Sequence, residues 1–120
     1  MSKEREVVEL FFRASETEDI DTAMSCFTDD GIWISPEGIE PGTTYTMADI
    51  REYLIQQIGV LREFEAQGIS VDYDEFQAAG DKVYISAAVR QADGKVLNRF
   101  VDVFTMRDGK IAIKDVFRKA

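Results

Sequence analysis

The sequence predicts an α+β fold in which three helices pack on one face of a mostly antiparallel sheet. Apolar residues recur at helical spacing in three segments before residue 67, and from Gly68 onward they alternate with polar residues at a period of two. Turn signals separate these later runs. At 120 residues the chain has the usual size of one domain, so we expect residues 1–120 to form a single domain.

The three helices are expected over about 3–16, 20–26 and 47–66. The first and third carry an apolar stripe opposite charged residues, and the second is short. Thr46 is followed three residues later by Asp49, a spacing typical of a capping box, in which both side chains accept hydrogen bonds from unpaired amide groups. The stripe of the third helix consists of Ile50, Tyr53, Leu54, Ile58, Leu61 and Phe64.

The strands are predicted from alternation and from the turn signals that bound them. A short strand is expected at 32–34, between a turn at Asp29-Asp30-Gly31 and Pro36. The segment 37–45, which has two glycines and a proline, predicts a loop. Four further strands, joined as a meander with hairpin turns at Asp93-Gly94 and Asp108-Gly109, are expected over about 69–76, 82–91, 96–106 and 110–117.

The charge of the chain limits its partners. The formal net charge is −9, and the sequence lacks the concentrated basic face with which nucleic-acid-binding proteins neutralise phosphates. The acidic excess also disfavours an anionic membrane surface. No stretch approaches the roughly 20 apolar residues of a membrane span, and the charged N-terminus is unlike a signal peptide. We therefore expect no nucleic acid and no membrane among the partners.

Two residue types that support common chemistries are scarce or absent. There is no histidine, which excludes Ser-His-Asp and Cys-His catalysis and histidine-bearing metal sites within this chain. Cys26 is the single cysteine, so no internal disulfide can form, and a reducing, cytoplasmic location is expected. We expect neither a metal nor another cofactor.

Three strings resemble the nuclear transport factor 2-like superfamily, the cystatin-like α+β cone that includes steroid delta-isomerases, SnoaL-type polyketide cyclases and limonene epoxide hydrolases. They are Asp19-Ile-Asp-Thr-Ala-Met-Ser-Cys-Phe-Thr-Asp-Asp-Gly-Ile-Trp33, Gly42 with Met47-Ala-Asp-Ile-Arg-Glu-Tyr-Leu54, and Phe100-Val-Asp-Val-Phe-Thr-Met-Arg-Asp-Gly-Lys-Ile111. The resemblance covers nearly the whole chain. It implies a strongly curved sheet that, with the helices, encloses a deep apolar pocket, and a homodimer through the outer face of the sheet.

Alternation along the third long strand agrees with a pocket on one face and a partner on the other. Both faces are partly apolar, as expected when one covers the core and the other meets a second copy. One face carries Asn98, Phe100, Asp102 and Phe104, and the other carries Arg99, Val101, Val103 and Thr105.

Two enzymatic patterns of the superfamily are incomplete here. The resemblance to steroid delta-isomerases places the catalytic base on Ser35, a donating tyrosine on Phe11 and a donating acid on Asp102. Only the acid is present, and a serine hydroxyl cannot act as a base near pH 7. The limonene epoxide hydrolases are similar at Lys114-Asp-Val-Phe117, but the strand 83–89 lacks the arginine and aspartate that orient their water.

Asp102 and Asp115 remain as candidate catalytic residues. Each is predicted to stand on an otherwise apolar strand face, where desolvation raises the pKa of a carboxyl, and we expect at least one of the two pKa values to be raised. SnoaL-type cyclases resemble this layout and use one inward aspartate as the acid–base group of an aldol closure. The resemblance thus implies a cofactor-free cyclase or isomerase of a hydrophobic carbonyl compound.

The alternative is a non-catalytic protein, either an apolar-ligand-binding protein or a dimeric interaction module. In it Asp115 pairs with Lys114, Arg99 or Lys110, and Asp102 caps a backbone group or accepts a hydrogen bond from Tyr84 or Tyr53. Under either hypothesis a hydrophobic small molecule is the expected ligand. The side chains expected to line its pocket are Phe11, Trp33, Ser35, Tyr53, Phe100, Phe104 and Phe117.

Overall fold

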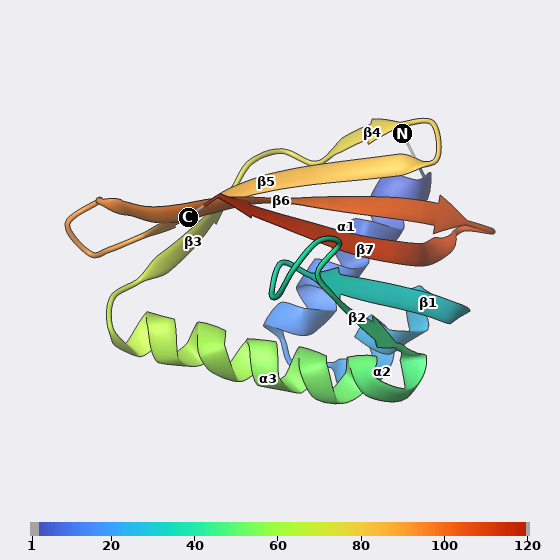
Figure 1. The fold of residues 1–120 in the computed structure, drawn as a ribbon, viewed down its shortest axis with the longest axis horizontal. Helices are drawn as coiled ribbons and strands as arrows, with labels where there is room; N and C mark the ends of the chain where they lie inside the picture. Colours follow the sequence, from blue (N-terminus) through green and yellow to red (C-terminus); the bar gives the residue numbers. More distant parts are fainter. Residues whose placement is uncertain (1–2, 120) are drawn as a thin grey trace.

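The computed structural model describes residues 3–119 and shows three helices and one seven-stranded sheet (Figure 1). In chain order the elements are α1 (Lys3–Glu16), α2 (Ile20–Ser25), β1 (Phe27–Ser35), β2 (Thr43–Thr46), α3 (Met47–Ala66), β3 (Ser70–Tyr73), β4 (Gln77–Ala79), β5 (Lys82–Arg90), β6 (Val96–Arg107) and β7 (Lys110–Lys119). Within these residues no helix is long and apolar enough to cross a membrane.

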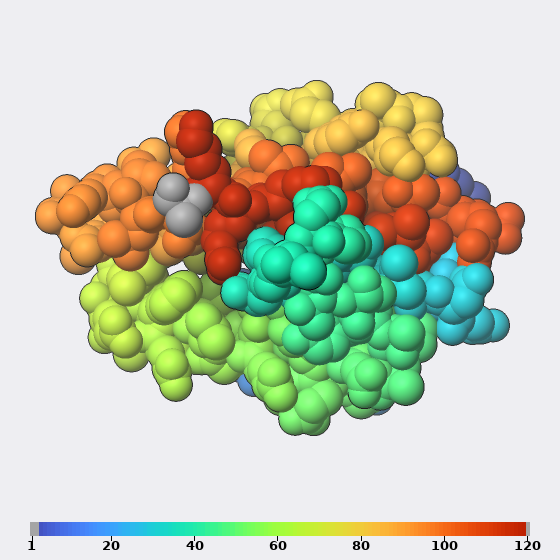
Figure 2. All heavy atoms as spheres, in the orientation of Figure 1, coloured from blue at the N-terminus to red at the C-terminus, as the bar shows by residue number. Residues whose placement is uncertain are grey.

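The sheet is mixed but mostly antiparallel, which confirms the predicted α+β class. Its strand order is β2-β1-β7-β6-β5-β3, and β4 pairs with β5. Only the β1–β7 pair is parallel among these strands. In Figure 1, α1 lies behind the long strands, and α3 runs along the side of the molecule where β1 and β2 lie. In Figure 2 the green atoms of α3 and of the segment before it lie against the red atoms of β7.

Alternation along β6 is confirmed. Phe100, Asp102 and Phe104 point toward the helices, where Asp102 and Phe104 are buried, and Val101 on the opposite face is exposed. The register places Asp102 between Ile85 of β5 and Val116 of β7. The central strand thus carries a carboxylate into the interior between two apolar neighbours.

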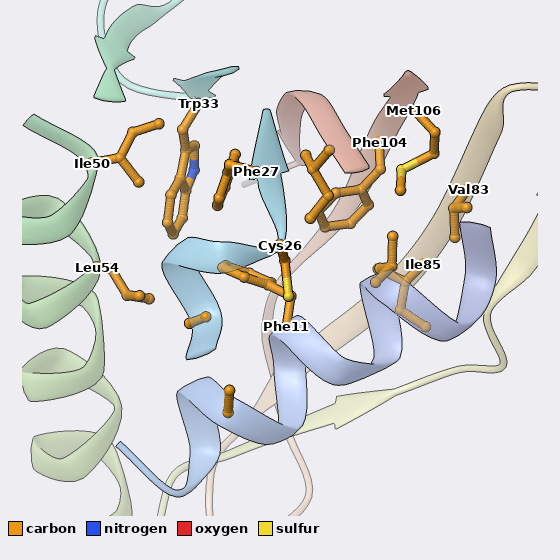
Figure 3. Close-up of a cluster of buried hydrophobic side chains, with 14 of the residues drawn as sticks. Phe11, Cys26, Phe27, Trp33, Ile50, Leu54, Val83, Ile85, Phe104 and Met106 are labelled. Atoms are coloured by element: carbon orange, nitrogen blue, oxygen red, sulfur yellow. The ribbon is translucent and has the colours of Figure 1, made fainter. Parts of the chain in front are cut away.

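The core is an aromatic cluster between α1 and the inner face of the sheet (Figure 3). Phe11 of α1 is its centre: the ring makes edge-to-face contacts at centroid distances of 5.5 to 6.4 Å with four other rings, which lie in Phe12, Phe27, Trp33 and Phe104. Ile50 and Leu54 of α3 close the cluster on the side of Trp33. Such pairs add stabilisation to that from buried area alone.

The first strand is longer than predicted, because the turn expected at Asp29-Asp30-Gly31 is wrong. These residues belong to β1, where the pairing with β7 is interrupted between Phe27 and Ile32. The carboxylate of Asp30 forms an ion pair with Arg107, and this hydrogen bond lowers the pKa of Asp30. The acidic residues therefore occupy an irregular stretch of strand instead of ending it.

The segment predicted as a loop over 37–45 ends in a short strand, β2, which pairs with β1 at Ser35 and Thr43. Gly42 makes this return possible. Its φ is +113°, and a Cβ atom there would lie 2.1 Å from the carbonyl oxygen of Ser35. Thr46 precedes α3 as predicted, but its side chain makes no capping hydrogen bond.

A β-bulge in β7 reverses the faces of its later residues. Met106 pairs with Ile111, but Thr105 pairs with Ile113, so Ala112 is an extra residue in β7. Because side chains alternate along a strand, one extra residue moves every following side chain to the opposite face. Lys114 therefore points toward the helices and Asp115 away from them.

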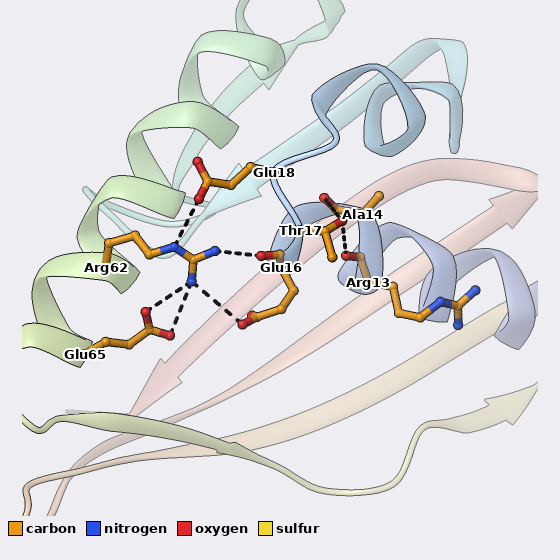
Figure 4. Close-up of polar contacts among 7 residues, drawn as sticks. All are labelled: Arg13, Ala14, Glu16, Thr17, Glu18, Arg62 and Glu65. Atoms are coloured by element: carbon orange, nitrogen blue, oxygen red, sulfur yellow. Dashed lines mark hydrogen bonds and ion pairs between the residues drawn. The ribbon is translucent and has the colours of Figure 1, made fainter.

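One arginine joins the two long helices (Figure 4). Arg62 of α3 donates to the backbone carbonyl of Glu16, the last residue of α1, at 2.6 Å. It also contacts the carboxylates of Glu18 at 3.3 Å and Glu65 at 3.1 Å. A cation at the C-terminus of a helix interacts favourably with the helix dipole. Arg62 thus fixes α3 against the end of α1.

Candidate ligand-binding site

A cavity of about 390 Å³ lies between the helices and the inner face of the sheet. Its walls are mostly apolar and aromatic, with side chains from α1, α3, β1, β3, β5, β6 and β7. This volume is in the range of small-molecule sites. The main lining residues are Phe11, Phe12, Trp33, Tyr53, Leu54, Ile58, Leu61, Phe64, Tyr73, Phe100, Asp102, Lys114 and Val116.

Two of the charged residues of the cavity wall, Asp102 and Lys114, form a buried ion pair. The Nζ of Lys114 lies 3.0 Å from Oδ2 of Asp102, and the side chains are 6% and 3% exposed, respectively. The cationic end of Lys114 also lies 4.2 Å from the ring centroid of Trp33 and 5.3 Å from that of Phe104. An ammonium over an aromatic face is attracted by the ring, so these contacts hold Lys114 in place beside Asp102.

The two oxygens of Asp102 differ in their partners. Oδ2 accepts from Lys114, whereas Oδ1 is buried and has no hydrogen-bond partner among the described residues. Buried polar atoms without a partner are rare in folded proteins, because leaving one unpaired costs about 1–3 kcal/mol. Asp102 belongs to the cavity wall, and Oδ1, itself buried, is the oxygen that Lys114 leaves without a partner.

Two tyrosines add hydroxyl groups to the cavity. Burial raises the pKa of Tyr53, and a hydrogen bond to Ser35 opposes part of that rise. Burial, with a smaller contribution from the negative charge of Asp102, also raises the pKa of Tyr73. Both phenols therefore stay protonated at neutral pH and are able to donate hydrogen bonds.

An ion pair crosses one part of the cavity wall. Arg118 of β7 donates to the two carboxylate oxygens of Glu37 at 2.7 and 3.3 Å, and both residues line the cavity. Glu37 belongs to the segment that connects β1 to β2. This exposed contact joins the end of β7 to that segment.

The structure brings together some of the side chains predicted for the site and separates others. Asp102, Phe11, Trp33, Tyr53 and Phe100 line the cavity. Ser35 and Phe104 are fully buried behind its wall and are not lining residues.

Asp115 and Phe117 lie on the outer face of the sheet, opposite Val103 and Val101 of β6. The two aspartates therefore do not share a pocket, because the bulge at Ala112 turns Asp115 outward. Lys114 was not predicted as a site residue for the same reason. An isolated lysine in an apolar strand was the available signal, but its face depended on the unpredicted bulge.

Burial and the nearby charge of Glu40 raise the pKa of Asp115. An acid with a raised folded-state pKa favours the fold when it is protonated, so its contribution is complete below about pH 3.9 and is lost as the pH rises through the folded-state value. We expect Asp115→Asn to stabilise the protein slightly at pH 7, by about 0.5 kcal/mol or less, and not at pH 3. Urea unfolding at both pH values measures this.

The exposed Asp29 offers the matched control, since Asp29→Asn removes one negative charge elsewhere on the surface. If Asp115→Asn raises the free energy of unfolding equally at pH 3 and pH 7, ionisation of Asp115 is not the cause of the stabilisation.

The cavity lies between α1, α3 and the inner face of a mixed, mostly antiparallel sheet, and a buried carboxylate belongs to its wall. The model of the SnoaL-like domain family matches residues 8–113, and the chain belongs to this family. The resemblance noted from the sequence is thereby confirmed. No curated protein matches the chain.

Several solved structures share the fold over nearly the whole chain. TerC, co-crystallised with polyporic acid, is 27% identical with a TM-score of 0.72, over 98% of this chain and 92% of TerC. A cystatin-like protein of unknown function from Xanthomonas campestris is 26% identical with a TM-score of 0.69, over 100% and 92% of the two chains. The epoxide hydrolase/cyclase-like enzyme SalBIII, which takes part in pyran ring formation in the polyether salinomycin, is 23% identical with a TM-score of 0.71. The match covers 98% of this chain and 91% of SalBIII.

Proposed function

We propose that the protein binds a hydrophobic carbonyl compound in its cavity and catalyses a cofactor-free acid–base reaction on it, a cyclisation or an isomerisation. The observation that carries this proposal is the free Oδ1 of Asp102, an unpaired acceptor in an apolar wall. The crystal structure of TerC with polyporic acid and the cyclase-like SalBIII support the same kind of pocket.

In this reaction Asp102 acts as the base. Its Oδ1 takes a proton from the carbon next to the carbonyl group, the electron pair of the broken C–H bond forms a C=C bond, and the carbonyl oxygen becomes an enolate oxygen. A hydroxyl of Tyr53 or Tyr73, both in the cavity wall, donates to that oxygen. Lys114 does not touch the substrate in this scheme and orients Asp102 through the ion pair at Oδ2.

The test is deuterium exchange into 2-tetralone, a bicyclic ketone, followed by proton NMR in D₂O. The wild-type protein is expected to exchange the α-hydrogens faster than the uncatalysed reaction. General base catalysis contributes about 10²–10⁴-fold, so Asp102→Asn should lower the catalysed rate at least about a hundredfold. Asp115→Asn is the matched control, because it makes the same chemical change outside the cavity, and it should keep the wild-type rate.

A second candidate function, non-catalytic binding of an apolar ligand, is favoured by the ion pair itself. Lys114 occupies one oxygen of Asp102 in a buried ion pair, a structural role that requires no reaction. Binding of 2-tetralone without exchange above the uncatalysed rate would reject the enzymatic proposal and support this one.

We also propose that the chain forms a homodimer through the outer face of the sheet. Apolar side chains are exposed there: Tyr84 is 37%, Val101 38% and Phe117 51% exposed. Light scattering at micromolar concentration is expected to give a dimer. Val101→Glu should shift it toward monomer, because a twofold axis places the two new charges close together.

Ile55→Glu serves as the control for this change. Ile55 is 45% exposed on α3, away from the outer face of the sheet, and its replacement should leave the dimer intact. A wild-type protein that is monomeric at tens of micromolar, or a dimer that Ile55→Glu breaks and Val101→Glu does not, would reject this interface.

A further inference from the structure

One stretch of the cavity wall is completed by a connecting segment and not by a strand. β1 ends at Ser35, one residue after Ile34, which forms the last pair of the parallel ladder with Asp115 of β7. β7 continues to Lys119, and beyond Asp115 it pairs only with β6 among the described strands. The segment 36–42, which connects β1 to β2, lies beside this part of β7, as the teal and red atoms show in Figure 2.

The contact between this segment and β7 is the ion pair of Glu37 with Arg118, and both residues line the cavity. Burial is the main cause that raises the pKa of Tyr53, and the charge of Glu37 adds to the rise while that of Arg118 opposes it. Both charges therefore lie near the hydroxyl of Tyr53. The ring of Tyr53 meets Trp33 edge to face at 4.9 Å, so the ion pair borders the part of the cavity that holds Trp33.

The backbone of Glu37 is held in place, but the two side chains of the ion pair are not enclosed. The N–H of Glu37 donates to Oγ of Ser35 at 3.3 Å, and the hydroxyl of Thr43 donates to the carbonyl oxygen of Glu37 at 3.1 Å. The side chains of Arg118 and Glu37 are 39% and 57% exposed. Exposed ion pairs are weak and are screened by salt, so these side chains can separate while the backbone stays in place.

We propose that the Glu37–Arg118 ion pair is a gate of the cavity: the two side chains close the wall between segment 36–42 and the end of β7, and their separation opens an entrance beside Tyr53 and Trp33. The strands do not move, because Ser35 and Thr43 keep the backbone of Glu37 in place. The inference rests on the proposed small-molecule site and specifies how molecules reach it, but it requires neither a particular ligand nor a reaction.

The test is quenching of Trp33 fluorescence by acrylamide, with quenching constants taken from fluorescence lifetimes. Trp33 is the single tryptophan, lines the cavity and is 6% exposed. Acrylamide is small and uncharged, so removing a charge from the protein does not change its approach. Glu37→Gln removes the ion pair and keeps the length of the side chain. Loss of one exposed ion pair should raise the quenching constant about two- to fivefold at low salt.

Salt provides a second readout. An increase from about 0.05 to about 0.5 M sodium chloride should raise the quenching constant of the wild-type protein, because screening weakens the ion pair, and should leave that of Glu37→Gln nearly unchanged. The salt dependence of the wild-type protein tests the proposal without any variant.

Arg107→Gln is the matched control. It removes another exposed ion pair, with Asp30, at the opposite end of the β6–β7 pair, and neither of these residues lines the cavity. The wild-type quenching constant should be kept. The double variant Glu37→Arg with Arg118→Glu restores an ion pair of reversed polarity and should return the quenching constant toward that of the wild type.

A quenching constant of the wild-type protein that salt does not raise, no increase in Glu37→Gln, an equal increase in Arg107→Gln, or a double variant that is quenched as strongly as Glu37→Gln would each overturn the inference. Failure of the proposed function has a different signature. If quenching follows the ion pair but the protein neither binds 2-tetralone nor exchanges its hydrogens, the gate is supported and the proposed function is rejected. Exchange of 2-tetralone without any effect of the ion pair on quenching rejects the gate alone.

Discussion

Replacing Lys114 by methionine is expected to destabilise the fold by about 3–5 kcal/mol, because it leaves the charge of Asp102 buried without its cation. Both members of the pair are almost fully buried, and the remaining neighbours of Asp102 in the sheet are the apolar Ile85 and Val116. Urea unfolding of the wild-type protein and Lys114→Met at pH 7 measures the loss.

The double variant Asp102→Leu with Lys114→Met is the informative control. Replacing both members of a buried pair by apolar residues of similar size is often neutral or stabilising. We expect the double variant to recover most of the stability that Lys114→Met loses. A single variant within about 0.5 kcal/mol of the wild type would mean that water or another cation reaches Asp102.

Replacing Phe11 by alanine is expected to cost about 3–5 kcal/mol, as for other large-to-small changes at buried aromatic positions. Phe11 is 2% exposed and contacts four other aromatic rings. Thermal and urea unfolding give the change, and the fluorescence of Trp33, the single tryptophan, reports whether the loss spreads to the cavity wall.

Leu10→Ala tests the same helix on its outward side. Leu10 is 36% exposed, so its removal leaves no enclosed void, and we expect a cost of about 1 kcal/mol or less. Comparable losses for the two variants would show that the helix itself, and not the aromatic cluster, determines the effect of Phe11→Ala.

The sequence predicted best where the pattern was long and regular. The stripe of α1 and the alternation of β6 correctly placed Phe11, Phe100 and Asp102 on interior faces. Both patterns depend only on the periodicity of a helix or strand, which is fixed by backbone geometry. The α+β class followed from the order of these segments.

The prediction that Asp115 faces the pocket was wrong, because the alternation of side chains was extended across an undetected bulge. Ile111 is buried as alternation predicts, but Ala112 is the extra residue, and from Ile113 onward each side chain faces the other way. No glycine or proline marks the bulge in the sequence. Its position is set by pairing with β6 and β1, which is tertiary information.

Prediction of the structure in the middle of the chain was limited by a different effect. Asp29-Asp30-Gly31 has the composition of a turn, yet it lies within β1, where the ion pair with Arg107 involves one of its acids. That partner is remote in sequence, so local propensity could not indicate it. Similarly, β2 was assigned to a loop because its four residues form a strand only through pairing with β1.

The position of β7 between β1 and β6 also determines when the protein can fold during synthesis. Ile32 pairs with Ile113, so this parallel ladder joins early and late parts of the sequence. A nascent chain that has emerged only to Gly109 has two open strand edges, on β1 and β6, and an aspartate that still lacks its lysine. Closure of loops this long slows folding. The addition of β7 therefore completes the sheet and supplies the partner of Asp102 in the same step, which leaves the unfinished chain dependent on protection from aggregation until then.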